Sequence, residues 1–149
     1  MATHYLACDL GAESGRLMLG TLDGGKISLE ELHRFPNGPV KEGSALHWNM
    51  DALFAELRAG LKKAAARKVP IASFSADSWG VDYILYDAAG KMMLPVWHYR
   101  DARTAGGVEK TRARVDWPTI YSETGIQFMA LNTIYQLAAE QAERLAKAK

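Results

Sequence analysis

The sequence contains very little cysteine and no long apolar run. Cys8 is the single cysteine, so no disulfide can form within the chain, and this favours a reducing compartment. The opening residues Met1-Ala2-Thr3-His4 lack the basic and apolar segments of a secretory signal. No stretch approaches the roughly 20 apolar residues that span a bilayer. We therefore expect a cytoplasmic protein with no membrane partner.

The chain also lacks an excess of charge of either sign. Its 149 residues include 18 Lys and Arg and 17 Asp and Glu, which gives a net charge of +1. Nucleic-acid binding depends largely on clustered basic side chains, so we expect no nucleic-acid partner. Hydrophobic residues make up 48% and charged residues 23% of the chain, a composition typical of a folded domain.

Short apolar segments separated by turns predict strands over residues 5–8, 16–22 and 26–35. Asp23-Gly24-Gly25 separates the last two as a hairpin turn, so the three strands should be antiparallel neighbours. Residues 71–76 predict a buried strand that returns parallel to the first by a right-handed crossover. Residues 81–86 predict one more strand, followed by a turn at 87–90.

Apolar residues at helical spacing predict a helix capped by Asn49 and ended before Pro70, after a loop over residues 36–48. Gly106-Gly107 predicts a break, with a weak helix over 108–115 and a strong one from Thr133 onward, capped by Asn132. The apolar face of the first helix comprises Met50, Leu53, Phe54, Leu57 and Leu61. The order strand, strand, strand, helix, strand indicates an α/β domain with a mixed sheet.

The segment Asp9-Leu10-Gly11-Ala12-Glu13-Ser14-Gly15-Arg16 carries the clearest chemical signal. Glycines let a backbone approach a ligand closely, and successive N–H groups in such a turn form an anion site. The Ser14 hydroxyl can donate a further hydrogen bond, and Arg16 can pair with phosphate oxygens. Asp9 is placed to hold Mg²⁺ through water. An ordinary hairpin turn with a surface aspartate is an equally weighted interpretation of this pattern alone.

Four blocks in a fixed order then resemble one family. They are Asp9 to Arg16 (DLGAESGR), Asp77 to Tyr83 (DSWGVDY), Tyr99 to Thr104 (YRDART) and Thr124 to Leu137 (TGIQFMALNTIYQL). Together they resemble the carbohydrate kinases of the glycerol, xylulose and rhamnulose kinase type, the rhamnulokinases most of all. The resemblance implies a ribonuclease H-like mixed sheet of the actin, Hsp70 and sugar kinase class, flanked by helices and incomplete in this chain.

The resemblance also implies roles at matching positions. ATP phosphates would lie against Ala12, Glu13, Ser14, Gly15 and Arg16, with Asp9 serving a Mg²⁺ ion. Many family members have small hydroxyl residues where this chain has Ala12 and Glu13. Because its carboxylate would repel phosphate, we expect the Glu13 side chain to face solvent or the metal. The partners implied are ATP as co-substrate and a small ketose sugar, with phosphoryl transfer to a sugar hydroxyl.

The sugar would contact Gly80, Trp79, Asp82, Arg100 and Asp101. Gly80 would bring backbone against the ligand, Trp79 would stack on it, and Asp82 would accept hydrogen bonds from hydroxyls. Hydrophobic packing of Trp79 and a turn role for Asp82 remain alternatives. For Arg100 and Asp101, a structural ion-pair network is weighted equally with a place in the sugar cleft.

The family's general-base aspartate lies beyond residue 149, as does its second domain. We therefore expect residues 1–149 to be the N-terminal part of the first kinase domain, inactive alone and prone to form homo-oligomers through uncovered sheet surface. Two other functions stay open. One is a ribonuclease H-like metal-dependent nuclease using Asp9, Asp77, Asp82 and Asp101, and the other is a binding module without chemistry.

Overall fold

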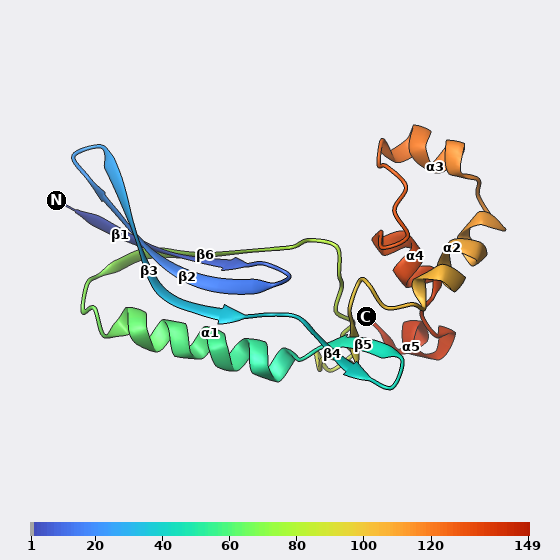
Figure 1. Cartoon of the computed structure of the whole chain (residues 1–149), viewed down its shortest axis with the longest axis horizontal. Helices are drawn as coiled ribbons and strands as arrows, with labels where there is room; N and C mark the ends of the chain where they lie inside the picture. Colours follow the sequence, from blue (N-terminus) through green and yellow to red (C-terminus); the bar gives the residue numbers. More distant parts are fainter. Residues whose placement is uncertain (1) are drawn as a thin grey trace. The chain divides into compact units, whose positions relative to one another are not determined.

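The computed structural model describes residues 2–149, which form two compact units. The first unit contains the described part of Met1–Gly38 together with Asn49–Gly80, and the second contains Pro39–Trp48 and Val81–Lys149. Each unit therefore combines two separate stretches of sequence. Figure 1 labels the helices of both units and all of their strands except β7 (Val96–Trp97).

The first unit is built on a four-stranded mixed sheet in the order β3-β2-β1-β6. The strands are β1 (Thr3–Leu10), β2 (Ser14–Asp23), β3 (Lys26–Pro36) and β6 (Ile71–Ser78). β1 and β3 both pair antiparallel with β2, whereas β6 pairs parallel with β1. The predicted order and directions are confirmed. Gly24 and Gly25 both have positive φ, which a tight turn between β2 and β3 requires.

Helix α1 (Met50–Ala65) links β3 to β6 and packs on β2 and β3. Its predicted cap is confirmed, since the Asn49 side chain accepts a hydrogen bond from the amide of Ala52 at 3.0 Å. Gly60 lets the helix approach the sheet, because a Cβ there would lie 3.2 Å from the Leu17 side chain. The core beneath the helix comprises Leu6, Cys8, Leu17, Leu19, Leu32 and Ala64.

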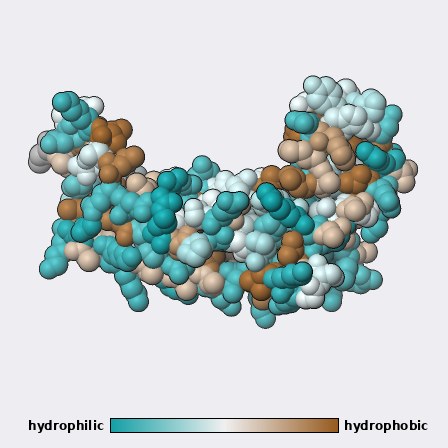
Figure 2. Space-filling model, viewed as in Figure 1, coloured by the Kyte–Doolittle hydropathy of each residue, from teal (hydrophilic) through white to brown (hydrophobic). Residues whose placement is uncertain are grey.

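The predicted burial of the strand over residues 71–76 is wrong. Every residue of β6 is exposed, including Phe74 at 51%. The strand lies at the edge of the sheet, and α1 covers β2 and β3 instead. On α1 itself, Phe54 and Leu61 of the expected apolar face are also exposed. Figure 2 shows further apolar surface near the β2–β3 hairpin of this unit, where Ile27 and Leu29 are exposed.

The second unit joins a small antiparallel sheet to four short helices. Its strands, in the order β4-β5-β7, are β4 (Pro39–Glu42), β5 (Ala45–Trp48) and β7 (Val96–Trp97). Its helices are α2 (Thr104–Arg112), α3 (Trp117–Thr124), α4 (Thr133–Ala138) and α5 (Ala142–Lys147). Within the described residues, no helix has the length and apolar character needed to cross a bilayer.

Several sequence predictions are wrong in this unit. The 36–48 segment contains the β4–β5 hairpin rather than a loop throughout. Residues 81–86 form no strand beyond one isolated bridge between Tyr86 and Met92. Gly106-Gly107 lies inside α2 instead of breaking it, since Gly107 lets the helix press against the Tyr135 carbonyl. The long final helix is divided into α4 and α5, and Asn132 precedes α4 without a side-chain cap bond.

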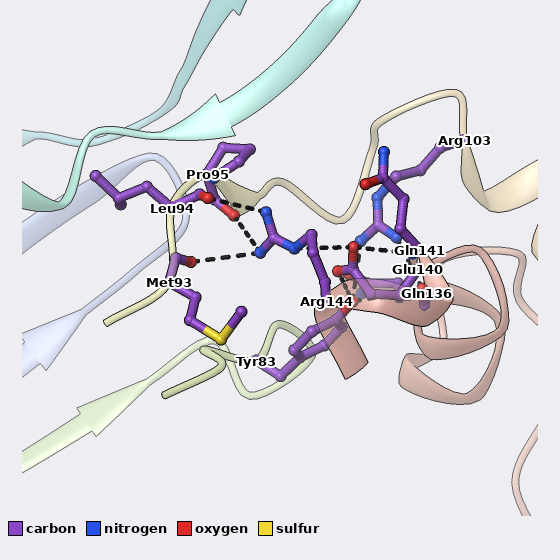
Figure 3. A network of polar contacts seen from close by, with 9 residues as sticks. All are labelled: Tyr83, Met93, Leu94, Pro95, Arg103, Gln136, Glu140, Gln141 and Arg144. Carbon is purple, nitrogen blue, oxygen red and sulfur yellow. Dashed lines mark hydrogen bonds and ion pairs between the residues drawn. The ribbon is translucent and has the colours of Figure 1, made fainter. Parts of the chain in front are cut away.

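A buried polar network holds the end of the chain in this unit (Figure 3). The Arg144 guanidinium donates to the backbone carbonyls of Met93, Leu94 and Pro95 at 2.9–3.3 Å. It also pairs with Glu140, whose other oxygen accepts from the Tyr83 hydroxyl at 2.8 Å. Burial is the largest cause that raises the Tyr83 pKa, and the bond to Glu140 adds to it. The network therefore fixes α5 against the 93–95 segment.

Candidate functional site

The turn between β1 and β2 consists of Gly11, Ala12 and Glu13, because the strand pairing reaches Leu10 and Gly15. The Gly11 amide donates to the Ser14 carbonyl at 3.0 Å, so the turn is tight. Among the hydrogen bonds of residues 2–149, none engages the amides of Ala12 and Glu13. Glu13 is exposed, as expected for a carboxylate that faces away from an anion. The turn thus presents two backbone donors for a ligand.

Asn37 holds this turn from the end of β3. Its backbone amide donates to the Glu13 carbonyl at 2.9 Å, and its side-chain amide donates to the Gly11 carbonyl at 2.9 Å. The sequence predicted only a loop at this position, and nothing in the sequence pattern assigned Asn37 to the turn. Gly15 adds a second constraint, since a Cβ there would collide with the buried Phe35 ring.

Charged side chains form a row across the sheet next to this turn. Arg34, Arg16, Asp9 and Asp77 are successive Cα partners on β3, β2, β1 and β6. The Arg16 guanidinium contacts Asp9 Oδ2 through Nε at 2.8 Å and through Nη2 at 2.7 Å. Arg34 pairs with Glu31 at 2.6 Å, a hydrogen bond that lowers the pKa of the Glu31 carboxyl and raises that of Arg34. The sequence analysis missed Arg34.

The carboxylates of Asp9 and Asp77 are the oxygen donors available for a metal at this end of the sheet. They are Cα partners on the neighbouring strands β1 and β6. One oxygen of Asp77 accepts from the Ser78 amide at 2.9 Å. Hard carboxylate oxygens fit Mg²⁺, which uses few protein ligands and keeps several waters. In residues 2–149 no cluster of three or more His, Cys, Asp or Glu side chains that could hold a metal occurs.

The predicted sugar residues are distributed over both units. Gly80 and Trp79 follow β6 in the first unit, whereas Asp82, Arg100 and Asp101 belong to the second. Gly80 has φ +73°, a left-handed conformation that L side chains rarely adopt. The glycine is exposed and Trp79 is half-buried. The chain conformation at Gly80 therefore explains why glycine is needed there.

Asp82 and His98 both contact the same tryptophan, Trp48. The Trp48 indole donates to Asp82 Oδ2 at 2.6 Å, and the His98 ring packs 4.4 Å from the Trp48 ring, centroid to centroid. Burial lowers the pKa of His98, and its Nδ1 accepts from the Arg100 amide at 3.1 Å. Asp82 is thus anchored in an aromatic cluster, which the turn interpretation of this residue did not foresee.

Asp101 is buried and does not pair with the guanidinium of Arg100 or Arg103. Its Oδ2 accepts from the Leu46 amide at 2.7 Å, and its Oδ1 accepts from the Arg103 amide at 2.9 Å. These bonds tie β5 to the start of α2, which favours the structural interpretation of Asp101. Arg100 is exposed and lies over the Tyr99 ring, 5.4 Å from its centroid. Arg103 instead binds the Gln136 carbonyl at 2.8 Å.

Two curated proteins similar in sequence to this chain are both rhamnulokinases. No family model matches the chain. It is 43% identical to the rhamnulokinase of Ligilactobacillus salivarius (strain UCC118), over 96% of this chain and 30% of that protein. It is 39% identical to the rhamnulokinase of Bacillus subtilis (strain 168), again over 96% of this chain and 30% of that protein. The chain thus spans about 30% of the length of the curated relatives it matches.

Solved structures agree on the fold. The crystal structure of gluconate kinase from Lactobacillus acidophilus matches with a TM-score of 0.78 at 15% identity, over 99% of this chain and 30% of that one. This likeness confirms the predicted mixed α/β sheet of the sugar kinase class. The chain is therefore similar in sequence to the N-terminal part of rhamnulokinases, and its fold is that of the matching part of a sugar kinase structure.

Proposed function

We propose that this chain supplies the phosphate-binding turn and part of the sugar site of an ATP-dependent ketose kinase. The full reaction would be that of a rhamnulokinase, ATP and L-rhamnulose giving ADP and L-rhamnulose 1-phosphate. The observation that carries the proposal is the β1–β2 turn, where two unengaged amides lie next to the Asp9–Arg16 pair. Phosphoryl transfer depends mainly on such positioning and charge neutralisation.

Each residue of the turn has a defined part in this proposal. The amides of Ala12, Glu13 and Ser14 and the Ser14 hydroxyl would donate to phosphate oxygens, and Gly15 keeps β2 close to Phe35. Arg16, whose guanidinium contacts Asp9 in this structure, would turn toward the phosphates. Asp9 and Asp77 would hold a hydrated Mg²⁺, which would supply charge neutralisation on the phosphate oxygens. The sugar would contact the backbone at Gly80 and the side chain of Trp79.

Titration of the ¹⁵N-labelled chain with Mg·ADP, followed by NMR, tests the nucleotide site. We expect shifts in the amide signals of residues 12–16 and little change in α3, which carries none of the proposed contacts. Calorimetry with L-rhamnulose tests the sugar site separately. Nucleotide binding without any shift in residues 12–16 would contradict the proposal, as would a complete lack of nucleotide binding.

The 149-residue chain alone is expected to have no kinase activity. In the family that it resembles, a carboxylate acting as general base on the sugar hydroxyl lies beyond the matched region. A coupled assay for ADP release, with ATP and L-rhamnulose, measures this directly. Turnover that persists through successive purification steps would overturn the expectation. Since the reaction uses ATP and the chain has one cysteine, we place the protein in the cytoplasm.

The chain is also proposed to self-associate through β6. This strand has eight exposed residues, no proline within Ile71–Ser78, and one neighbouring strand, β1. Strand edges of this kind present unpaired backbone donors and acceptors to another strand. In an antiparallel β6–β6 pair centred on Phe74, the two Asp77 carboxylates would lie at opposite ends, so no like charges would meet. Light scattering over a concentration series measures the association.

A further inference from the structure

The peptide units of the β1–β2 turn have a defined orientation, set by a residue outside it. Asn37 donates from its side chain to the Gly11 carbonyl and from its backbone to the Glu13 carbonyl, both at 2.9 Å. A trans peptide unit is planar and points its C=O and N–H in opposite directions. The C=O of Gly11 shares a unit with the N–H of Ala12, and the C=O of Glu13 shares one with the N–H of Ser14. Both N–H groups must therefore point away from Asn37.

We propose that Asn37 is a positioning residue that turns the amides of Ala12 and Ser14 toward the nucleotide phosphates. This inference rests on the proposed function of the turn and adds to it a residue that touches no ligand. An anion site built from backbone amides requires their N–H groups to converge on one side. The two bonds from Asn37 take up the carbonyls on the other side, where they would otherwise be free to reorient.

Local geometry supports a fixed orientation rather than a loose one. The Gly11 amide is held by the Ser14 carbonyl at 3.0 Å, which closes the turn from within. Gly11 also has no room for a side chain, because a Cβ would lie 2.7 Å from the same carbonyl. Asn37 is partly buried at the end of β3, next to the Ser14–Pro36 pair of the β2–β3 ladder. The turn is thus held from inside by Ser14 and from outside by Asn37.

The test compares Asn37→Ala with Asn132→Ala in the whole chain. The Asn132 side chain also donates to a backbone carbonyl, that of Gln127, at the same distance of 2.9 Å. The control therefore removes an equivalent bond away from the turn. Inorganic pyrophosphate is the probe, and its affinity is measured from the amide shifts. Losing one positioning hydrogen bond should weaken binding about tenfold in Asn37→Ala. Asn132→Ala should bind like the unmodified chain.

A purely structural role is distinguished by where the amide signals change. We expect Asn37→Ala to reduce the pyrophosphate-induced shift of Ala12 more than that of Ser14, because the backbone amide of residue 37 still donates to the Glu13 carbonyl. The signals of α1 should stay in place. If the alanine variant does not fold, Asn37→Asp replaces it, because aspartate keeps the size of the side chain but loses its hydrogen-bond donor. Asn37→Asp should weaken pyrophosphate binding at least as much as Asn37→Ala. Unchanged affinity in the folded variants would overturn the inference.

A wrong proposed function and a wrong role for Asn37 give different experimental results. If the unmodified chain binds neither pyrophosphate nor ADP, the phosphate role of the turn is wrong. The orientation inference is then decided without ligand, from residual dipolar couplings of the Ala12 and Ser14 amides. An Ala12 coupling that changes in Asn37→Ala but not in Asn132→Ala would support the orienting role, and an Ala12 coupling that is the same in all three proteins would overturn it.

Discussion

The Asp9 carboxylate and the Arg16 guanidinium are paired across β1 and β2, and the guanidinium nitrogens Nε and Nη2 both contact the same oxygen, Oδ2. Each side chain is nearly half exposed, at 49% and 43%, so the pair is accessible to a ligand. An exposed pair of this kind stabilises a protein by only about 0–1 kcal/mol. The two side chains can therefore exchange their mutual contact for contacts with phosphate and metal at small cost.

Arg16→Gln is expected to weaken ADP binding by roughly tenfold to a hundredfold, the range for one charge-assisted hydrogen bond. The melting temperature should change little, because the ion pair that is lost is exposed. Calorimetry and thermal unfolding measure the two effects. Arg58→Gln, an exposed arginine on α1, is the control and should leave both values unchanged. An equal loss of affinity in both variants would rule out a specific role for Arg16.

Gly107→Ala is expected to destabilise the second unit by about 1–3 kcal/mol or more, the usual cost of overpacking. A Cβ at this position would overlap the backbone carbonyl of Tyr135, where α2 and α4 meet. The neighbouring Gly106 lies in the same helix and has open space, so Gly106→Ala should be neutral or stabilising by up to about 1 kcal/mol. Urea unfolding of both variants gives the comparison. Equal effects would show that α2 and α4 are not packed this closely.

Acid is expected to destabilise the second unit through His98. Burial lowers the His98 pKa in the folded protein, so the unfolded chain binds more protons just below pH 6.5. The His98 contribution is therefore fully present above this pH and is lost progressively as the pH falls toward the lowered value. His98→Gln should flatten the dependence of unfolding free energy on pH between 7 and 5. A slope that is identical in the variant would exclude His98 as its source.

The β6 edge should determine whether the chain self-associates. Phe74→Lys places a charge at the centre of the exposed strand, where Lys is a common protection against edge pairing. We expect this variant to scatter as a monomer at concentrations where the unmodified chain is a dimer. Tyr121→Lys replaces another exposed aromatic residue, on α3, and should not change the association. Dimers that persist in Phe74→Lys would place the interface elsewhere.

Local signals made the first unit largely predictable from sequence. The Gly24-Gly25 turn fixed the β2–β3 hairpin, and Asn49 fixed the start of α1, because both depend on a few neighbouring residues. The exposure of β6 was not predictable in this way. An apolar strand looks the same in sequence whether or not another layer covers it, and here α1 lies over β2 and β3.

The second unit was predicted less well because its structure depends on distant contacts. Val81 looked like the start of a strand, yet its carbonyl accepts from the side chains of Thr133 and Gln136, about 50 residues later. The same applies to the candidate site. Asp9 and Arg16 were found from a contiguous motif, whereas Asn37 contacts Gly11 across 26 positions and gave no pattern to detect.

The contacts of Arg144 impose an order on the folding of the two units during synthesis. On a ribosome, all of Met1–Gly38 and Asn49–Gly80 has been made by residue 80, so the first unit can fold while the chain is still growing. The second unit must wait, because Met93, Leu94 and Pro95 obtain their Arg144 donor only after residue 144 has been made. Until residues 96–97 have been made, the β4–β5 hairpin also lacks its β7 partner.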